Sequence, residues 1–454
     1  MSCLKDLRTT DSRADKKRIE ETKGSLLKDS YRWLFEHSDF NQWRNDTKRP
    51  LLWIKGDPGK GKTMLLFGII DEMSRDKDAA ALLSYFFCQA TDLRLNNATA
   101  VLRGLICLLI DQQPSLISHV QKRYDQGAKN PFEGVNAWAA LSMVFVDVLE
   151  DLTLQSSTYL IVDALDECDT DLPQLLNLII QSASRFPCVK WVVSSRNKPD
   201  IEARLRLDHT QIMRLSLELN EKHISRAIEI FIDFRVSRLP LINDESALQE
   251  KVRGQLYAKA TGTFLWVALV LAELELVESY DVLEVLDEMP PGLKPLYHRM
   301  TQQIDQLQRK DPGLCYHVLS TMALAYRPLH LLELGSLSSL PEHISKSIDH
   351  VAKVVRKCGS FVTIREGTVF FIHQSAKDYL LEDAYDKFFP TGSEECQYAI
   401  LSQSLRVLSS ALRRDIYRLK APGISIDQVS DFFHHVVGLL ITCPIERQLR
   451  QRDL

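Results

Sequence analysis

Several features that mark particular classes of protein are missing from this chain of 454 residues. It has no uninterrupted apolar run of 18 or more residues, which excludes an ordinary transmembrane helix. Its N-terminal sequence, MSCLKDLRTTDSRADKKR, is charged and has no apolar core, so it is not a signal peptide. The formal net charge is only −4, which gives no indication of a surface that binds nucleic acid or acidic membranes.

The cysteines lack any pairing pattern. The nine cysteines include no C-x-x-C pair and their number is odd, which favours reduced and mostly buried thiols. Such thiols are typical of intracellular proteins, so we expect a cytoplasmic location. Hydrophobic residues make up 45% of the chain and charged residues 26%, which fits a globular protein with room for about three domains.

The chain does contain one complete sequence motif. Residues 56–63 have the sequence GDPGKGKT and match the P-loop pattern G-x-x-x-x-G-K-[ST] at every position. The apolar run LLWI at 51–54 predicts a buried parallel strand before the loop, and MLLFGII at 64–70 predicts a helix after it. These flanks argue against the alternative, a glycine-rich turn without a ligand.

Each residue type in the P-loop has a physical role in phosphate binding. Glycines let successive N–H groups point inward at phosphate oxygens, and the start of the following helix adds its positive dipole end. Lys62 places a charge on the β- and γ-phosphates, and Thr63 offers a hydroxyl to Mg²⁺. We therefore predict that the chain binds a nucleoside triphosphate or diphosphate. The predicted phosphate-binding residues are Gly56, Asp57, Pro58, Gly59, Lys60, Gly61, Lys62, Thr63 and Met64.

An acidic segment at 157–169, STYLIVDALDECD, complements the P-loop. Its apolar run predicts a central parallel strand that ends in Asp163, which places a carboxylate beside the P-loop for Mg²⁺. Asp166 and Glu167 follow. A hydrolytic ATPase needs one carboxylate for the metal and another to orient or deprotonate water. The alternative is an acidic loop after a strand. The predicted metal ligands are Thr63 and Asp163, and the predicted catalytic residues are Glu167, Asp166 and Lys62.

A further strand is predicted at 189–196, VKWVVSSR. In an ATPase sheet, a cation at such a strand end can sense the γ-phosphate, so we assign Arg196 to the nucleotide site. A surface arginine at a strand terminus is the alternative. Strands alternate with helices from 50 to 200, which predicts an α/β P-loop NTPase domain with a parallel sheet and helices on both faces.

The rest of the chain is predicted to be mainly helical. An aromatic stripe before the first strand is interpreted as core packing, with one side of a base pocket as the alternative. Pro290-Pro291-Gly292 breaks the helical pattern and marks a boundary. Further on, helices and a hairpin around Arg365-Glu366-Gly367 indicate a winged-helix module. The predicted parts are a polar linker at 1–24, a helical segment at 25–49, the nucleotide-binding domain at 50–214, a helical domain at 215–290, a winged-helix-like domain at 291–385 and a helical tail at 386–454.

Three motifs together resemble the NACHT family of STAND signalling NTPases, in particular the NOD-like receptors and NACHT–WD proteins of filamentous fungi. They are GDPGKGKT with its flanks, LIVDALDE and VVSSR. The family's extended acidic motif is a strand ending in Asp, then a small residue, an apolar residue and Asp-Glu, which here is Asp163-Ala164-Leu165-Asp166-Glu167. The segments LKDSYRWLFEHSDFNQWR, RPLHLLEL and FIHQSAKDYLL also look like fungal members, so the resemblance extends over about residues 20–430. The first part is similar as well to the nephrocystin-like N-terminal NTPase module.

The resemblance implies a switch. In the family, ADP holds a closed state, and its exchange for ATP permits oligomerisation and signalling in non-self recognition or regulated cell death. It therefore implies ATP/ADP and Mg²⁺ as cofactors, slow hydrolysis, self-association in the ATP state, and effector and sensor domains or proteins as partners. His373, in FIHQSAKDYLL, matches the winged-helix histidine that contacts the ADP β-phosphate in related receptors. Without that match, His373 would be interpreted as a packed or capping residue.

The chain departs from the family pattern in places. Relatives often have Gly-x-Pro to cover the base, whereas this chain has Gly262-Thr263-Phe264, so GTP stays open beside ATP. Within these 454 residues we expect no effector domain before the NTPase region and no WD, ankyrin or TPR array after it, and a fragment of a longer protein, a truncated gene and a minimal form remain as alternatives.

Other functions remain as alternatives. A P-loop kinase would need an acceptor-substrate motif, and none is visible. A scaffold without turnover is disfavoured because Lys62, Thr63, Asp163 and Glu167 are intact. DNA binding through the winged helix lacks a basic recognition helix, since residues 375–382 carry one lysine and two acids.

Overall fold

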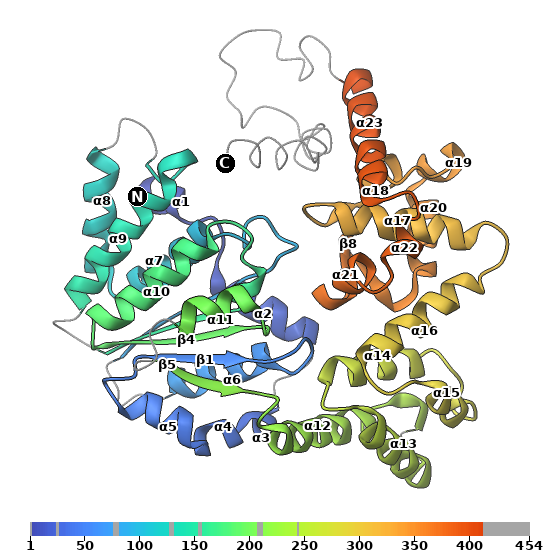
Figure 1. The fold of residues 1–454 in the computed structure, drawn as a ribbon, viewed down its shortest axis with the longest axis horizontal. Coiled ribbons are helices and arrows are strands. Elements are labelled where there is room, and N and C mark those ends of the chain that lie inside the picture. The colour runs from blue at the N-terminus through green and yellow to red at the C-terminus, as the bar shows by residue number, and fades with distance from the viewer. Residues whose placement is uncertain are drawn as a thin grey trace. The chain divides into compact units, whose positions relative to one another are not determined.

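The computed structural model describes residues 2–23, 27–75, 81–126, 131–152, 157–206, 212–242 and 245–411. The chain divides into two compact units, residues 1–292 and 293–454 (Figure 1). Each unit has its own sheet. No helix among the described residues is long and apolar enough to cross a membrane.

The first unit is organised around a five-stranded sheet in the order β2-β3-β4-β1-β5, and every pairing is parallel. Its strands are apolar and mostly buried, as expected of a sheet with both faces covered. The parallel α/β prediction is confirmed. The strands are β1 (Leu51–Lys55), β2 (Leu82–Phe87), β3 (Thr158–Asp163), β4 (Val189–Ser195) and β5 (Ile212–Ser216).

Helices cover both faces of this sheet. On one face the ring of Phe67 in α6 (Lys62–Arg75) lies 5.0 Å from the ring of Phe87 in β2. On the other face Phe145 of α9 (Ala137–Leu152) lies 6.1 Å from Trp191 of β4. This second core also includes side chains of α7 (Ala98–Gln112), α10 (Leu172–Arg185) and α11 (Pro199–Arg206) (Figure 1).

The N-terminal residues differ from the prediction of a polar linker. They form α1 (Ser2–Leu7) and α2 (Ser12–Lys23). Leu7 is fully buried, and the guanidinium of Arg103 in α7 donates to the carbonyl oxygens of Asp6 at 2.8 Å and Leu7 at 3.1 Å. Lys16 forms an ion pair with Asp71 at 2.9 Å. The charged residues of this segment suggest a solvated chain, but some of them form contacts with the rest of the first unit.

The helical segment predicted before β1 is present, and its aromatic stripe lies in the core. Phe40 and Trp43 are fully buried, with ring centroids 5.3 Å apart, and Trp43 contacts Tyr159 of β3 at 6.0 Å. Core packing is therefore the correct interpretation for these two residues. The short helices here are α3 (Lys28–Tyr31), α4 (Trp33–Glu36) and α5 (Ser38–Asn45).

Helices follow the sheet within the first unit. Trp266, fully buried in α14 (Phe264–Leu274), donates from Nε1 to the carbonyl oxygen of Pro290 at 2.9 Å, so the last residues of this unit are attached to its own helices. The remaining elements are η1 (Pro114–Leu116), α8 (Ile117–Gln126), η2 (Gly134–Asn136), η3 (Leu165–Glu167), α12 (Glu221–Val236), η4 (Pro240–Ile242), α13 (Ser246–Lys259), α14 (Phe264–Leu274) and α15 (Val282–Glu288).

The second unit combines helices with a small antiparallel sheet in the order β6-β8-β7. Its predicted hairpin is confirmed: Arg365 pairs with Thr368, and Glu366 and Gly367 both have positive φ, as a two-residue hairpin turn requires. Its elements are α16 (Leu293–Asp305), α17 (Asp311–Leu324), β6 (Leu329–His330), α18 (Leu331–Leu337), α19 (Glu342–Ser345), α20 (Ile348–Lys357), η5 (Gly359–Phe361), β7 (Val362–Arg365), β8 (Thr368–Phe371), α21 (Gln374–Leu381), α22 (Tyr385–Phe388) and α23 (Ser393–Ala411). The predicted tail beyond residue 411 lies outside the described residues.

Candidate nucleotide site

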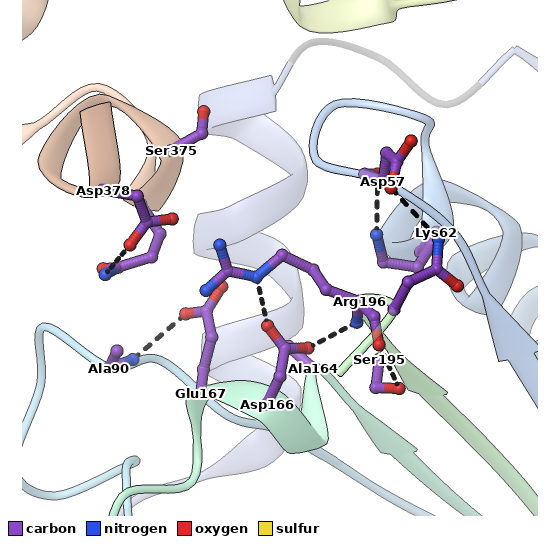
Figure 2. A network of polar contacts seen from close by, with 12 residues as sticks. Asp57, Lys62, Ala90, Ala164, Asp166, Glu167, Ser195, Arg196, Ser375 and Asp378 are labelled. Atoms are coloured by element: carbon purple, nitrogen blue, oxygen red, sulfur yellow. Dashed lines mark hydrogen bonds and ion pairs between the residues drawn. The ribbon is translucent and has the colours of Figure 1, made fainter. Parts of the chain in front are cut away.

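The P-loop joins β1 to α6, as the motif predicts. Gly59 and Gly61 have φ of +76° and +85°, a backbone region that favours glycine. The ammonium of Lys62 donates to the carbonyl oxygen of Gly56 at 2.5 Å. It also donates to the carbonyl oxygen of Asp57 at 2.9 Å (Figure 2). The loop therefore folds back around the lysine that is predicted to meet the phosphates.

Residues 261–265, which precede and begin α14, lie directly on the P-loop. The backbone N–H of Phe264 donates to the carbonyl oxygen of Gly59 at 2.9 Å. A Cβ added to Gly59 would stand 2.8 Å from both Thr263 Cγ2 and Leu265 Cβ, and one added to Gly61 would stand 3.0 Å from the Phe264 ring. The tripeptide that replaces the relatives' Gly-x-Pro is thus in contact with the phosphate-binding loop.

The charges around Lys62 come from three strand ends. Burial lowers the pKa of Lys62 below its ordinary value, while the carboxylates of Asp166, Asp163 and Glu218 act in the opposite direction and Arg196 adds to the lowering. A half-buried ammonium surrounded by these groups is suited to an anionic ligand that brings its own negative charge.

Asp163 ends β3 and is only 3% exposed. Its carboxylate accepts a hydrogen bond from the hydroxyl of Ser194, and the same hydroxyl accepts from the backbone N–H of Ala164 at 2.9 Å. Because Val162 pairs with Val193, Ser194 and Asp163 are neighbours at the carboxyl edge of the sheet. Ser194 therefore fixes the carboxylate that is predicted to hold Mg²⁺.

Asp166 and Arg196 form a buried pair. Asp166 accepts from both the backbone N–H of Arg196, at 2.8 Å, and its guanidinium, and the two side chains are 2% and 17% exposed (Figure 2). The alternative of a surface arginine is therefore wrong. A role for Arg196 as a γ-phosphate sensor stays a prediction.

Glu167 is held differently from its neighbour Asp166. Its Oε2 accepts from the backbone N–H of Ala90, just after β2, at 3.0 Å (Figure 2). Glu167 and Asp166 therefore both lie at the carboxyl edge of the sheet, and the role of Glu167 as the group that activates water stays a prediction.

The other predicted P-loop residues lie where the motif places them. Pro58 and Lys60 belong to the turn before α6, and the Lys60 ammonium lies 3.5 Å from the carbonyl oxygen of Thr261. Thr63 and Met64 are in the first turn of α6. A hydroxyl from Thr63 and a carboxylate from Asp163 are hard oxygen donors, the kind that Mg²⁺ prefers, so the donor set fits the ion.

Besides Ser194, two further residues at this edge were not predicted. Glu218, just after β5, accepts from the backbone N–H of Asp57 at 2.7 Å, and Asn197, just after Arg196, donates to the side chain of Asp57 at 3.0 Å. A sequence signal existed for Glu218, because it follows a strand of a parallel sheet at the edge where the P-loop lies.

His373 belongs to the second unit and is the N-cap of α21. Its Nδ1 accepts from the backbone N–H of Ser375 at 3.1 Å and lies 2.8 Å from the Ser375 hydroxyl. The capping role, considered in the sequence as the alternative, is therefore present. An Nδ1 that accepts leaves the proton of a neutral ring on Nε2, which is then a donor.

Comparisons with known proteins agree with the motifs. Residues 29–196 match the family model described as nephrocystin 3, N-terminal. The chain is 50% identical over 442 residues to vegetative incompatibility protein HET-E-1 of Podospora anserina, a match that spans 94% of this chain and 32% of that protein. The chain thus spans about a third of the length of this curated relative.

Solved structures are more distant. The Walker-type ATPase PABY2304 of Pyrococcus abyssi is 12% identical with a TM-score of 0.35, over 76% of this chain and 93% of that one. The ORC1 protein of Aeropyrum pernix, solved in complex with DNA, is 16% identical with a TM-score of 0.37, over 78% and 91% of the two chains. Likenesses at this level carry no argument about this chain.

The motifs, the geometry of the loop between β1 and α6, and the two sequence matches agree with one another. Residues 29–196 thus resemble the nephrocystin 3 N-terminal family, and the chain as a whole is similar to HET-E-1, a fungal vegetative incompatibility protein.

Proposed function

We propose that the chain is a nucleotide-dependent switch that binds ATP or ADP with Mg²⁺, hydrolyses ATP slowly and controls self-association through its nucleotide state. One observation carries the proposal: the P-loop with Lys62, Asp163 and Glu167 all lie at the carboxyl edge of one parallel sheet. This edge is where ligands bind in open α/β sheets.

The roles of the residues follow from their chemistry. Lys62 neutralises charge on the β- and γ-phosphates, and the backbone N–H groups around Gly59 and Gly61 donate to the phosphate oxygens. Thr63 and Asp163 would hold Mg²⁺, which neutralises the phosphate charge when bound. Glu167 orients a water molecule and takes its proton on the carboxylate.

A coupled switch suits the fold better than an ordinary kinase. The contacts of residues 261–265 with Gly59 and Gly61 join the phosphate-binding loop to α14, so a change in the loop displaces helix residues directly. A ligand can bias only states that it contacts differently, and these protein contacts would pass such a difference from the loop to α14. A scaffold without turnover would bind nucleotide in the same way, but Glu167 would have no catalytic role. A GTP-specific form would differ from the proposed switch only in the base that it binds.

We further propose that the second unit is a winged-helix domain and that His373 contacts the ADP β-phosphate in a closed state. The order α17, β6, α18, α20, β7, β8 supports the first part, and a donor Nε2 on His373 supports the second. His373→Asn keeps an N-cap side chain but removes the Nε2 donor, whereas His373→Ala removes both. Faster ADP release in both variants supports the phosphate contact; faster release in His373→Ala alone would assign His373 to the cap.

The wider biology is proposed by relationship. HET-E-1 is named for vegetative incompatibility, and we propose that this chain acts in fungal non-self recognition or regulated cell death in the cytoplasm. Effector and sensor domains or proteins would supply its input and output.

The decisive experiment identifies the nucleotide that co-purifies with the protein and compares its mass by light scattering with ATP and with ADP. We expect bound ADP, preference for ATP over GTP in competition, and larger particles with ATP. Lys62→Ala is the control and should neither carry nucleotide nor change mass. A wild-type protein that binds no nucleotide would overturn the proposal, and a clear preference for GTP would overturn the choice of base.

A further inference from the structure

The carboxylate of Glu218 lies against the first residues of the P-loop. Its Oε1 accepts from the backbone N–H of Asp57 at 2.7 Å, and its Oε2 accepts from the hydroxyl of Ser216 at 2.9 Å. A Cβ added to Gly56 would stand 3.2 Å from Oε1 and 3.0 Å from Leu217 Cβ. The loop therefore passes directly over the chain that leaves β5.

Asn197 holds the same part of the loop from the other side. Its side-chain amide donates to Asp57 Oδ1 at 3.0 Å. Burial alone would raise the pKa of Glu218, but hydrogen bonds from Asp57, Ser216 and Asn197 outweigh it, and the pKa of Glu218 is lowered. The segments that follow β4 and β5 thus both bind Asp57 through charge-assisted hydrogen bonds.

These contacts determine the surroundings of Lys62. The carbonyl oxygens that accept from the Lys62 ammonium belong to Gly56 and Asp57, the two residues that Glu218 packs against and binds. The position of Lys62 therefore depends on the carboxylate of Glu218, which acts through Gly56 and Asp57 and needs no direct bond to Lys62.

We propose that Glu218, assisted by Asn197, is a positioning residue that holds the P-loop and Lys62 in the geometry that accepts nucleotide phosphates. This role rests on the proposed nucleotide binding. A negative charge beside a phosphate site opposes binding, so the benefit of Glu218 must come through its hydrogen bonds and the preorganisation that they give.

Glutamine separates the two effects. Glu218→Gln keeps an acceptor for the Asp57 N–H and can donate its amide to the Ser216 hydroxyl, but it has no charge. Glu218→Ala removes the hydrogen bonds and the charge together. Glu221, exposed in the first turn of α12, provides a matched control as Glu221→Ala.

The experiment measures the dissociation constant of fluorescently labelled ADP and ATP for these variants, and the melting temperature without nucleotide. We expect Glu218→Ala to bind about 10-fold more weakly, the low end for hydrogen bonds to a charged group, while Glu218→Gln and Glu221→Ala bind like the wild type. Asn197→Ala should weaken binding by a smaller factor. The nucleotide-free melting temperatures of Glu218→Ala and Glu218→Gln should be close.

Two results would overturn the role of Glu218 while leaving nucleotide binding intact. One is wild-type affinity in Glu218→Ala; the other is equal weakening in Glu218→Gln and Glu218→Ala. A wild-type protein that binds neither nucleotide would instead overturn the proposed function, so the two failures are distinguishable.

Discussion

The P-loop and the acidic turn after β3 lie at the same edge of the sheet, but they are held by different means. The acidic turn is fixed by side chains of the adjacent strand: Ser194 binds Asp163, and Arg196 binds Asp166. The P-loop is fixed by residues that come much later in the chain, namely Glu218 and residues 263–265. The chemistry of the acidic turn is therefore local to the sheet, whereas the shape of the P-loop depends on the helical part of the same unit.

The largest expected effect is on catalysis by the acidic turn. Glu167→Gln removes the predicted base while keeping the side-chain shape, so we expect ATP hydrolysis to fall by about 10²–10⁴-fold with little loss of ATP affinity. Single-turnover hydrolysis and nucleotide binding together measure this. The control is Asp166→Asn: if it loses hydrolysis while Glu167→Gln does not, the two roles are reversed.

Breaking the buried pair should show how firmly the acidic turn is held. Arg196→Ala leaves the carboxylate of Asp166, 2% exposed, without its guanidinium partner. Since removing one partner of a buried pair typically costs about 3–5 kcal/mol, we expect the free energy of unfolding in urea to fall by about 3 kcal/mol. The double variant Arg196→Ala/Asp166→Asn should recover part of this loss. A single variant within about 0.5 kcal/mol of the wild type would mean that the pair behaves like a surface ion pair.

The dependence of the P-loop on distant residues is tested at Gly59. An alanine there must adopt a φ of +76° and place Cβ 2.8 Å from Thr263 and Leu265. The backbone term alone is about 1–2 kcal/mol, so we expect a lower melting temperature and weaker nucleotide binding. Gly254→Ala is the control, because this exposed glycine lies inside α13 with nothing within 4 Å of the added Cβ. It should stabilise the protein by about 0.5–1 kcal/mol. Equal effects at the two glycines would contradict the packing argument.

The smallest expected effect is on the pH dependence of stability. The pKa of Glu218 is lowered from 4.5 in the folded protein, so its contribution is fully present above pH 4.5 and is lost as the pH falls through the folded-state value. Glu218→Gln has no such group. Melting temperatures of the two proteins should therefore be closest at the most acidic pH and diverge as the pH rises to 4.5. A difference that does not vary with pH would show that the charge of Glu218 contributes nothing.

The sequence predicts the parts of this fold that are encoded locally. The P-loop, its strand and its helix are contiguous, and the apolar run before Asp163 is sufficient to place a central strand. The contacts of Asp166 with Arg196 are not predictable in this way, because they depend on β3 and β4 being neighbours in the sheet. The role of Ser194 was not predicted for the same reason, because its contact with Asp163 also depends on the order of the strands.

The N-terminal helices and Glu218 were missed for related reasons. In α2, lysines and acids suggest solvation, yet Lys16 pairs with Asp71 of α6. Glu218 stands in the sequence LSLEL, where it suggests the end of a strand, and only the position of β5 next to β1 brings it to the P-loop. A polar side chain directly after any strand of a predicted parallel sheet is the signal that could have identified it.

The docking of α1 on α7 has a consequence for the order of folding. The hydrogen bond from Arg103 to the carbonyl oxygen of Asp6 joins residues 97 positions apart. Contacts of such long range carry a loop-closure entropy that must be offset by structure already formed, so they arise late. Because α1 is synthesised before α7, it cannot bury Leu7 until α7 has been made, and for that interval its apolar side chains depend on other protection from aggregation.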